Sequence, residues 1–306
     1  MKSYLVLGSS FLYVRCMIEA FFNFMQYEKR SSVQTITSYR TDLDQYSKYL
    51  LFQYELSAPE KASSDMLRSW VVSLMEEAMN PSSVNRKIAA LRSFYGYLRR
   101  KKVIASDPSK LLTSLKMRKK IPLFLEEKAM ETLFDTALFA EDFEGIRDQC
   151  ILELFYGTGI RLSELIGLDV SDVDFVGRTI RVFGKNAKER LVPISQGLAN
   201  LVAHYLTLRA PVEDTDSLIL TDSGKSSYPV FIQRKVKKYL SYVTTLQKKS
   251  PHILRHTYAT HLLNRGADLN AIKELLGHAN LAATQVYTHN SIEKLKKTHE
   301  QAHPKA

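Results

Sequence analysis

The chain has 306 residues, enough for two domains of ordinary size, and its 45% apolar and 25% charged residues are typical of a globular rather than a disordered protein. Its 43 Lys and Arg against 32 Asp and Glu give a formal net charge of +11, which favours a polyanionic partner, although a basic protein without one fits this composition equally well. The two cysteines, Cys16 and Cys150, exclude a disulfide scaffold and a cysteine zinc cluster. No apolar run approaches the roughly 20 residues of a membrane span, so we expect a cytoplasmic protein with no membrane partner.

Residues 1–16 precede the first clear pattern. They begin with a basic residue and a short apolar patch, but Gly8-Ser9-Ser10 and Arg15 interrupt the patch before it reaches the length of a signal peptide. We therefore interpret residues 1–16 as an N-terminal extension.

Residues 17–115 carry apolar side chains at helical spacing in four segments, over about 17–30, 32–51, 64–77 and 82–100. Asn80-Pro81-Ser82-Ser83 combines a turn with an N-cap and predicts the start of the fourth helix. The side chains expected to face the core are Ile18, Phe21, Phe22, Met25, Ile36, Tyr39, Leu43, Tyr46, Leu50, Leu67, Trp70, Val71, Leu74, Val84, Ile88, Leu91, Phe94, Tyr95 and Leu98. This pattern predicts a helical domain.

Basic residues occupy the other faces of the fourth helix. They are Arg86, Lys87, Arg92, Arg99, Arg100, Lys101 and Lys102. With Tyr39 and Arg40 on a neighbouring helix they predict a surface that contacts phosphates, while a solvated charged face is the alternative for any one of them. Charge continues into residues 116–124, where Pro122 disfavours helix, and we interpret this segment as a basic linker between two domains.

Residues 125–306 combine helices with a β-hairpin. Helices are predicted over 126–139, 146–156, 161–168, 251–264, 268–276 and 291–301. Residues 179–183 and 190–194 are rich in β-branched and aromatic side chains and flank a Gly-Lys-Asn turn, which predicts two strands.

Two cations lie at turns of this half. Arg161 follows the glycine-bearing turn Gly157-Thr158-Gly159, which can aim a side chain, and Glu164 lies one helical turn further on, where it could brace the guanidinium. Lys185 lies in the hairpin turn, where a lysine that reaches a DNA groove could give a proton to a leaving alkoxide. Taken singly, each also fits a structural or solvent-facing role.

The strongest local pattern is His252-Ile253-Leu254-Arg255-His256. On a helix, His252 and Arg255 are three residues apart and project to one side. His252 and His256 also have the i, i+4 spacing of a zinc pair, but Arg255 would hold a cation beside the metal and the glutamate of the zinc motif is missing. An anion therefore suits this segment better, and no metal or other cofactor is expected.

His278 follows a predicted helix end, and Tyr287 comes nine residues later. One tyrosine among 16 is far more often a packing or surface residue, and a phenol with a pKa of about 10 needs help to ionise. That judgement changes because two arginines, a lysine and two histidines accompany this tyrosine. The arginines can hold a charged phosphate while the phenol oxygen bonds to phosphorus.

These residues resemble the tyrosine recombinase (phage integrase) family. Thr158-Gly159-Ile160-Arg161-Leu162-Ser163-Glu164-Leu165 is similar to its first arginine box, and Gly184-Lys185 followed by Lys188-Glu189-Arg190-Leu191-Val192-Pro193 to its lysine hairpin. His252-x-x-Arg255-His256, Leu275-Leu276-Gly277-His278 and Tyr287-Thr288-His289 match the second box in order and spacing. Within the family the chain is most similar to the Xer group, although its hairpin turn reads Asn186-Ala187 where Xer proteins tend to have Gly-Asn.

The resemblance implies a mainly α fold with a helical N-terminal core-binding (SAM-like) domain and an α-rich C-terminal catalytic domain that contains a small antiparallel β-sheet. We expect the core-binding domain over residues 17–115, the basic linker over 116–124 and the catalytic domain over 125–306. The activity it implies is site-specific DNA recombination, with the resolution of chromosome dimers at segregation as the expected reaction.

Roles follow from the resemblance, residue by residue. Tyr287 would attack the scissile phosphate and form a 3′-phosphotyrosyl link, leaving a free 5′-hydroxyl. Arg161 and Arg255 would bind the non-bridging oxygens, where charge grows in the transition state.

The remaining roles concern protons and the phosphate. Lys185 would protonate the leaving 5′-oxygen, His252 would assist proton transfer at the tyrosine, and His278 would donate to the phosphate. The implied partners are a double-stranded DNA recombination site, further protomers in a tetramer on that DNA, a second Xer recombinase and a cell-division DNA translocase.

Four other functions stay open. An integrase of a mobile element is closest, although such proteins often carry an arm-binding domain that sixteen residues cannot make. A type IB topoisomerase shares the chemistry but would relax DNA without a specific site. A DNA-binding protein without catalysis would trap no covalent adduct, and a metallohydrolase built on the histidines would lose its activity in a chelator.

Overall fold

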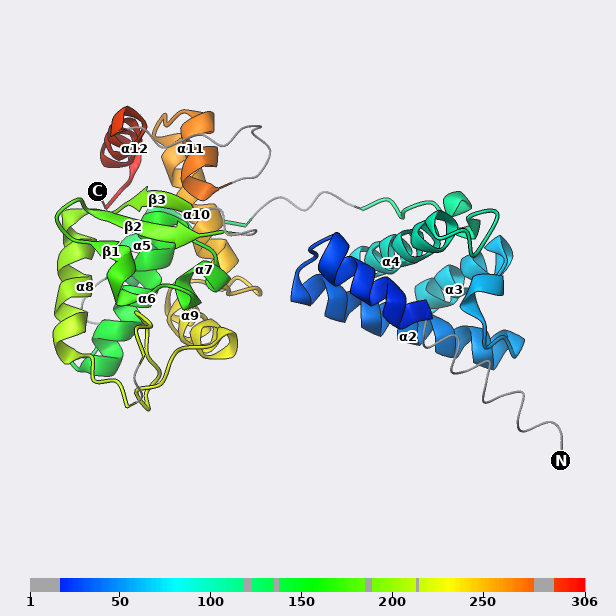
Figure 1. Cartoon of the computed structure of the whole chain (residues 1–306). Helices are drawn as coiled ribbons and strands as arrows, with labels where there is room; N and C mark the ends of the chain where they lie inside the picture. The colour runs from blue at the N-terminus through cyan, green and yellow to red at the C-terminus, as the bar shows by residue number, and fades with distance from the viewer. Residues whose placement is uncertain are drawn as a thin grey trace. The chain divides into compact units, whose positions relative to one another are not determined.

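The computed structural model describes residues 17–117, 123–134, 138–184, 189–212, 215–277 and 289–305. The chain divides into two compact units, Met1–Lys120 and Ile121–Ala306 (Figure 1). The extension predicted over 1–16 and residues 118–122 of the predicted linker lie outside the described residues. Across the described ranges, no helix has both the length and the apolar stretch that crossing a membrane requires.

Helices build the first unit. A helical stretch over 17–23 and a π-helical turn, η1 (Phe24–Glu28), precede the three long helices α2 (Val33–Tyr54), α3 (Ser64–Glu76) and α4 (Pro81–Arg100). Two 3-10 turns, η2 (Pro59–Lys61) and η3 (Pro108–Leu111), connect or follow them. Ser32, Ser63 and Asn80 begin the three long helices, because each side chain accepts a hydrogen bond from a backbone N–H of the first turn. The four predicted helices are confirmed.

Aromatic side chains dominate the core of the first unit. Tyr46 and Tyr95 are fully buried and satisfy each other through a hydrogen bond of 2.8 Å, and Trp70 packs against Tyr46 with ring centroids 4.9 Å apart. The apolar faces predicted for the four helices all join this core. The helical period therefore located the buried faces correctly.

The basic face predicted for α4 is corrected at Lys87. Its side chain is buried, and its ammonium donates to Asp42 of α2 (2.9 Å) and to Gln45. Arg86 also pairs with Asp42. The prediction was wrong here because the helical period identifies a face but not the neighbour that covers it, and α2 covers this one.

The other basic residues predicted for this surface divide into two groups. Arg40 pairs with Glu19, and Arg92 donates to a backbone carbonyl. The four basic residues at the end of α4 are exposed, namely Arg99, Arg100, Lys101 and Lys102. A phosphate-contacting surface on this unit would therefore centre on the end of α4.

Helices surround a small sheet in the second unit. The first helices are α5 (Glu127–Leu133), α6 (Phe143–Thr158) and α7 (Leu162–Ile166), followed by the 3-10 turn η5 (Val170–Asp172). The strands β1 (Val173–Asp174), β2 (Thr179–Phe183) and β3 (Glu189–Pro193) form an antiparallel sheet in that order, with Ile180 opposite Val192. The last helices are α8 (Gln196–Leu208), α9 (Pro229–Val243), α10 (Pro251–Asn264), α11 (Leu269–Leu276) and α12 (His289–Ala302).

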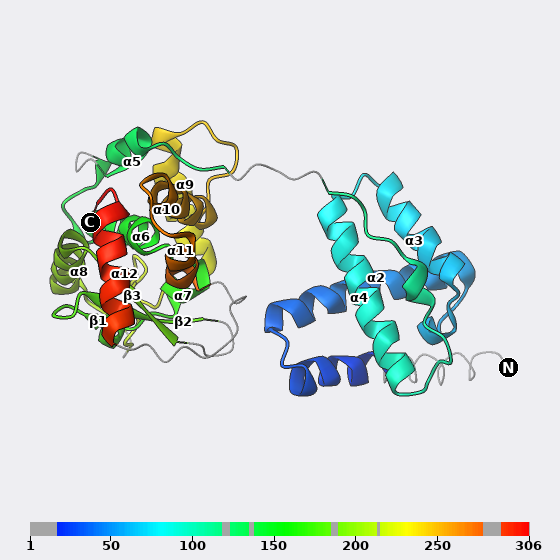
Figure 2. The same ribbon diagram turned by 90° about the horizontal axis from the view of Figure 1, so that it is seen from above.

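Helix α6 forms the centre of the second core. It packs against α8, α9 and α10, and Figure 2 shows it in the middle of this unit. Cys150, Ile151, Leu152, Leu154 and Phe155 are fully buried along it. A helix that is buried on nearly all sides fixes the position of whatever follows its C-terminus, and Arg161 follows it here.

One predicted helix is shorter than expected. The helix predicted over 126–139 is α5, which ends at Leu133. Phe134 stacks on Tyr156 of α6 (5.7 Å), whereas Phe139 stacks on Tyr239 of α9 (4.7 Å). The two rings are thus buried against different helices.

Candidate active site

Four segments of the second unit meet at the C-terminal end of α11. They are the junction of α6 and α7, the middle of α10, the strand β3 and the last residues of α11. We use the name α11 carbonyl cluster for the backbone carbonyl groups of Leu275, Leu276 and Gly277. Arg190, Arg255 and Arg161 each donate a hydrogen bond to one of them.

Gly159 ends α6 and turns the chain toward this cluster. Its φ of 63° lies in the left-handed region that glycine tolerates. A Cβ at this position would lie 2.5 Å from a ring carbon of Tyr258 and 2.8 Å from a side-chain carbon of Leu276. The glycine therefore lets the α6–α7 turn pack closely on α10 and α11.

Arg161 is the N-cap of α7 and lies at the edge of the site. Its Nη1 donates to Glu164 Oε1 (2.7 Å), its backbone N–H donates to Glu164 Oε2 (2.7 Å), and its Nη2 donates to the carbonyl of Gly277 (3.2 Å). Its side chain keeps 37% of its surface exposed, so it can still reach a ligand. The brace by Glu164 that the sequence suggested is present.

Arg255 lies deeper, on α10. Its Nη1 donates to the carbonyl of Gly159, and its Nη2 donates to the carbonyl of Leu276 (2.7 Å). Burial first, and then the positive charge of Arg161, lower the pKa of Arg255 to about 10. At neutral pH the guanidinium is still charged, and its repulsion by Arg161 shows that two cations share one site.

The α11 carbonyl cluster suits these cations. The end of an α-helix leaves carbonyl groups without helical partners and carries the negative end of the helix dipole. Successive carbonyls accept from Arg190 Nε (3.0 Å), Arg255 Nη2 (2.7 Å) and Arg161 Nη2 (3.2 Å). Three arginines from three different elements are thus oriented by one helix end.

The sequence analysis placed Arg190 in the hairpin motif but assigned it no chemical role. A signal was present, because Arg190 lies two residues from Val192 and therefore on the same, buried face of β3. An arginine on the buried face of a strand needs a partner of opposite charge, and here that partner is Glu164.

Glu164 lies among these arginines and is almost fully buried. Burial alone raises the pKa of its carboxyl, but the hydrogen bonds and charge of Arg190, and then of Arg161, outweigh burial and lower the pKa to about 2. The carboxylate is therefore ionised at all physiological pH values.

His252 is on α10, three residues before Arg255, with its side chain exposed. Partial burial lowers its pKa first, followed by the charges of Lys248, His256, Arg255 and Arg161. A lowered pKa favours the neutral imidazole at neutral pH, and neutral imidazole can accept a proton. The structure thus brings together Arg161, His252 and Arg255 from the predicted set.

Lys185, His278 and Tyr287 lie outside the described residues. In the sequence, Lys185 comes two residues after β2, His278 directly follows Gly277 of the carbonyl cluster, and Tyr287 comes two residues before α12. Their predicted roles stay predictions.

Helix α12 packs on its own unit, against β3, α10 and α11 (Figure 2). Two histidines attach it to the end of α6: His299 Nε2 lies 2.9 Å from the carbonyl of Gly157, and His303 Nε2 lies 3.0 Å from the carbonyl of Tyr156. Their rings stack with centroids 4.8 Å apart. Burial first, and then His299, lower the pKa of His303 to about 3. Both histidines therefore bind as neutral rings.

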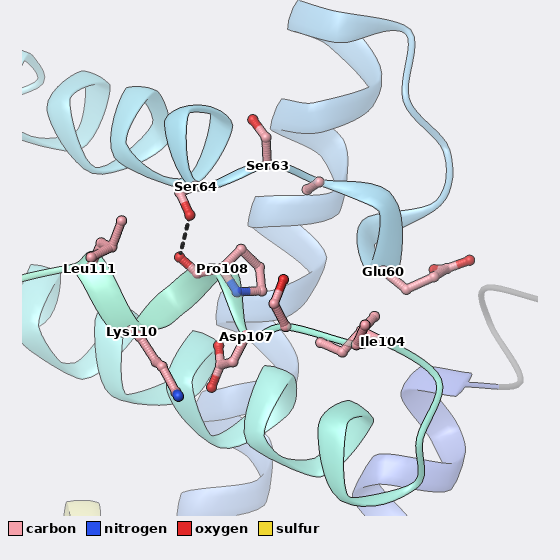
Figure 3. A pocket seen from close by; sticks show the side chains of 11 residues that line it. Glu60, Ser63, Ser64, Ile104, Asp107, Pro108, Lys110 and Leu111 are labelled. Carbon is pink, nitrogen blue, oxygen red and sulfur yellow. Dashed lines mark hydrogen bonds between the residues drawn. The ribbon is translucent and has the colours of Figure 1, made fainter.

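A metal centre and a pocket in the first unit are the alternatives to this site. Within the described ranges, no group of three or more His, Cys, Asp or Glu side chains could hold a metal ion. A pocket of about 580 Å³ in the first unit lies where the start of α3 faces η3 (Figure 3). Ser64 closes one side by donating to the carbonyl of Pro108 (3.0 Å), and the lining contains no arginine, histidine or tyrosine.

Family models agree with both units. The model described as "Phage integrase family" matches residues 123–294, and the model described as "Phage integrase, N-terminal SAM-like domain" matches residues 18–102. The chain is 37% identical over 321 residues to "Tyrosine recombinase XerC" of Chlorobaculum parvum, covering 95% of this chain and 96% of the relative. It is 35% identical over 299 residues to the protein of the same name in Bacillus subtilis, covering 96% and 98%.

Solved structures support the fold. A XerH site-specific recombinase bound to a palindromic difH substrate, in a post-cleavage complex, is similar with a TM-score of 0.70 at 20% identity, covering 88% of this chain and 80% of that one. The Tn1549 transposon integrase in complex with circular intermediate DNA gives a TM-score of 0.68 at 21% identity, covering 91% and 98%. On the family models and the similarity to curated relatives over nearly its full length, the chain belongs to the phage integrase family of tyrosine recombinases, enzymes that cut and rejoin DNA at specific sites.

Proposed function

We propose that this recombinase cuts DNA with Tyr287 as nucleophile and with Arg161, Lys185, His252, Arg255 and His278 as the residues that assist it. The observation that carries the proposal is the convergence of Arg161 and Arg255 on successive carbonyls of α11, immediately before His278 in the chain. Two guanidiniums oriented by neutral carbonyls form a site for an anion.

The arginines act on the phosphate. Arg161 and Arg255 bind the two non-bridging oxygens of the scissile phosphodiester, where negative charge grows as the phosphorus becomes pentavalent. Because their carbonyl partners already hold the guanidiniums, little reorganisation is needed during the reaction. His278 donates a further hydrogen bond to the phosphate.

Proton transfers accompany the exchange of bonds at phosphorus. The phenol oxygen of Tyr287 forms a bond to phosphorus as the bond from phosphorus to the 5′-oxygen breaks. His252 accepts the phenol proton, a role that its lowered pKa supports, and Lys185 gives a proton to the leaving 5′-oxygen. The products are a 3′-phosphotyrosyl link and a free 5′-hydroxyl, and a 5′-hydroxyl from another strand reverses the step to rejoin DNA without ATP.

The two units divide the work. We propose that residues 17–115 bind the DNA around the cleavage point, that 116–124 link the domains along the phosphate backbone, and that 125–306 carry out the chemistry. The exposed cations at the end of α4 support the first assignment, since they can contact phosphates without breaking an ion pair.

The biological reaction is proposed from the relatives. Curated relatives at 35–37% identity that cover more than nine-tenths of both chains carry the name XerC, which favours resolution of chromosome dimers at segregation over integration of a mobile element. Such a reaction takes place in the cytoplasm on double-stranded DNA. It would use four protomers, with a second Xer recombinase and a cell-division DNA translocase as further partners.

The C-terminal helix is proposed to take part in that assembly. In the single chain, this helix is attached to its own unit through His299 and His303. In a tetramer the same helix would pack into the neighbouring protomer in cyclic exchange. A chain truncated after His289 that still cleaved and recombined DNA normally would contradict this exchange.

Footprinting followed by covalent trapping tests the function. The chain is first footprinted on DNA from the replication terminus of its host to find the site it protects. A nicked suicide substrate carrying that site should then trap a covalent protein–DNA adduct with the parent chain and none with Tyr287→Phe. An adduct that persisted in Tyr287→Phe would overturn the assignment of the nucleophile. A site found in a mobile element and not in the chromosome would favour the integrase alternative.

A further inference from the structure

Arg190 is a buried arginine that the chemistry proposed above does not use. It lies on β3 and is 4% exposed. Arginine is almost never this buried unless it is paired, because its charge must leave water. Its partners therefore indicate what the residue is for.

Each of the three nitrogens of its guanidinium donates a hydrogen bond. Nη1 donates to Glu164 Oε1 (3.0 Å) and Nη2 to Glu164 Oε2 (2.9 Å), which is the bidentate fork that arginine makes with a carboxylate. Nε donates to the carbonyl of Leu275 (3.0 Å). Arg190 thus connects β3, α7 and the end of α11 through one planar group.

Glu164 is shared between two arginines. Oε1 accepts from Arg161 Nη1 as well as from Arg190 Nη1, and Oε2 accepts from the backbone N–H of Arg161 as well as from Arg190 Nη2. One negative charge is therefore shared between two positive ones. With Arg190 in place, Glu164 orients Arg161 without cancelling its charge, whereas without Arg190 the two would form a neutral pair.

Arg190 also restrains the carbonyl cluster. Its bond to Leu275 is the first of the three that hold the end of α11, and the next two come from Arg255 and Arg161. A Cβ at Gly277 would lie 3.0 Å from Arg190 Nη1, so the guanidinium packs directly against the residue whose carbonyl receives Arg161. Movement of Arg190 would therefore displace both anchors of Arg161.

We propose that Arg190 is a positioning residue of the recombination site: by holding Glu164 and the end of α11 together, it keeps the guanidinium of Arg161 oriented and available to a phosphate. This inference rests on the proposed function, because it assigns Arg161 a phosphate to bind. Arg190 itself is covered by protein and touches no reacting atom.

A purely structural role makes a different prediction. Removing one partner of a buried ion pair leaves the other charge uncompensated and destabilises the protein, so a purely structural role would lower activity and DNA binding only as far as the folded fraction falls. A positioning role separates these quantities. The cleavage rate of the folded protein at saturating DNA should fall by more than any loss of stability explains, while its DNA affinity stays near the parent value, because Arg190 is covered by protein.

The experiment uses the full chain and the nicked suicide substrate that carries the footprinted site. Arg190→Met removes the charge, and Arg190→Lys keeps the charge but loses the fork. We expect the single-turnover rate of adduct formation to fall roughly 100-fold in Arg190→Met, in line with the effect of a small misplacement of a catalytic group, and less in Arg190→Lys. The DNA dissociation constant and the melting temperature are measured in parallel.

The pH dependence of the cleavage rate tests whether Arg190 acts on Arg161 through Glu164. In the parent the pKa of this carboxyl is about 2, so it stays ionised from pH 8 to pH 5. In Arg190→Met burial still raises that pKa while the strongest lowering influence is gone, so protonation of Glu164 sets in as the pH falls and Arg161 loses its brace. The ratio of variant to parent cleavage rate should therefore decrease toward pH 5. A constant or rising ratio would overturn this route.

Arg181→Met is the matched control. Arg181 lies on β2 of the same sheet and bonds through Nε and Nη2 to one oxygen of the buried Asp172 (3.0 and 2.9 Å), but it contacts neither Glu164 nor α11. It should lose stability without loss of cleavage rate at saturating DNA. If Arg190→Met and Arg190→Lys kept the parent rate, or lost rate only in proportion to melting temperature and DNA affinity, the role of Arg190 would be structural. If the parent formed no adduct with its footprinted site, the proposed function itself would fail.

Discussion

Two groups of cations, one in each unit, differ in the partners that hold them. In the first unit, Arg86 and Lys87 both bond to the carboxylate of Asp42. In the second unit, Arg161 and Arg255 donate to backbone carbonyls at the end of α11. A carboxylate orients a cation and offsets part of its charge, whereas a carbonyl orients it and leaves the full charge in place.

This difference separates cations that build the protein from cations that can act on DNA. The net charge of +11 does not distinguish them, and neither does their position on a helix. The partner does. Glu164 is the instructive intermediate, since its single charge is divided between Arg161 and Arg190 and one positive charge is left over.

Replacing a cation that bonds only to backbone carbonyls should have the largest effect. That effect should be on the rate of DNA cleavage. In Arg255→Ala we expect the barrier to DNA cleavage to rise by about 3–4 kcal/mol, or roughly 10²- to 10³-fold in rate, because a preorganised donor to the growing charge is removed. The measurement is the rate of covalent adduct formation on the suicide substrate at saturating DNA.

Arg265→Ala is the control for that experiment. Arg265 caps the same helix, α10, and pairs at the surface with Glu127 (2.8 Å). Its removal should leave the cleavage rate unchanged. A comparable loss in both variants would mean that Arg255 matters for the helix and not for the phosphate.

Replacing a cation that bonds to a buried carboxylate should instead lower the free energy of unfolding. In Lys87→Met we expect the free energy of unfolding to decrease by about 3 kcal/mol, because the buried carboxylate of Asp42 keeps only Arg86, which is partly exposed. Urea unfolding of the full chain measures the change, and DNA affinity extrapolated to fully folded protein should not change. Lys102→Met, at an exposed position, should stay within about 0.5 kcal/mol of the parent.

Histidines that bind carbonyls differ from arginines because they can change charge. The pKa of His303 is lowered by burial, and then by His299, to about 3, against about 6.5 for a histidine in water. Its contribution to holding α12 is therefore complete above pH 6.5 and is lost as the pH falls. By pH 5 the loss should reach about 2 kcal/mol.

Hydrogen exchange of residues 295–303 at pH 7 and pH 5 measures this effect. Exchange in α12 should quicken at pH 5, after correction for the intrinsic rate, more than exchange in α6. His303→Gln should weaken the pH dependence, while His256→Gln, at an exposed position on α10, should retain it. Equal protection of α12 at both pH values would show that the histidines do not hold the helix.

The exposed cations at the end of α4 should give the smallest single effects. Replacement of Arg99 or Lys102 by Gln should reduce DNA affinity by a few-fold at low salt and lower the slope of log affinity against log salt by about 0.9 for each phosphate that the protein no longer neutralises. Fluorescence anisotropy on the footprinted site at several salt concentrations measures both. Arg86→Gln should change the slope less, because Arg86 bonds to the carboxylate of Asp42, which it shares with Lys87.

The helices of this protein follow from local patterns. The spacing of Leu67, Trp70 and Leu74 located the buried face of α3, and Pro81 after Asn80 located the start of α4. These features depend on residues within a few turns of one another, so the sequence displays them directly. The helix predicted over 126–139 was too long, because Phe134 and Phe139 are buried against α6 and α9, which come later in the chain.

The sequence identified some residues of the site and missed another. Arg161, His252 and Arg255 were found because their motifs are local and their residue types suit a phosphate, and the structure brings them together. Arg190 was overlooked because its partners, Glu164 and the carbonyl of Leu275, are 26 and 85 residues away in the chain. No local pattern records such a pairing.

What the sequence determined by itself was the set of helices, the buried face of each one, and the presence of cations suited to a phosphodiester. What only the tertiary structure decided was the partner of each cation: Asp42 for Lys87, a shared Glu164 for Arg161 and Arg190, and bare carbonyls for Arg255. The physical reason is that helical periodicity is set by neighbours along the chain. The charge that a buried cation keeps is set by groups that approach it from distant segments.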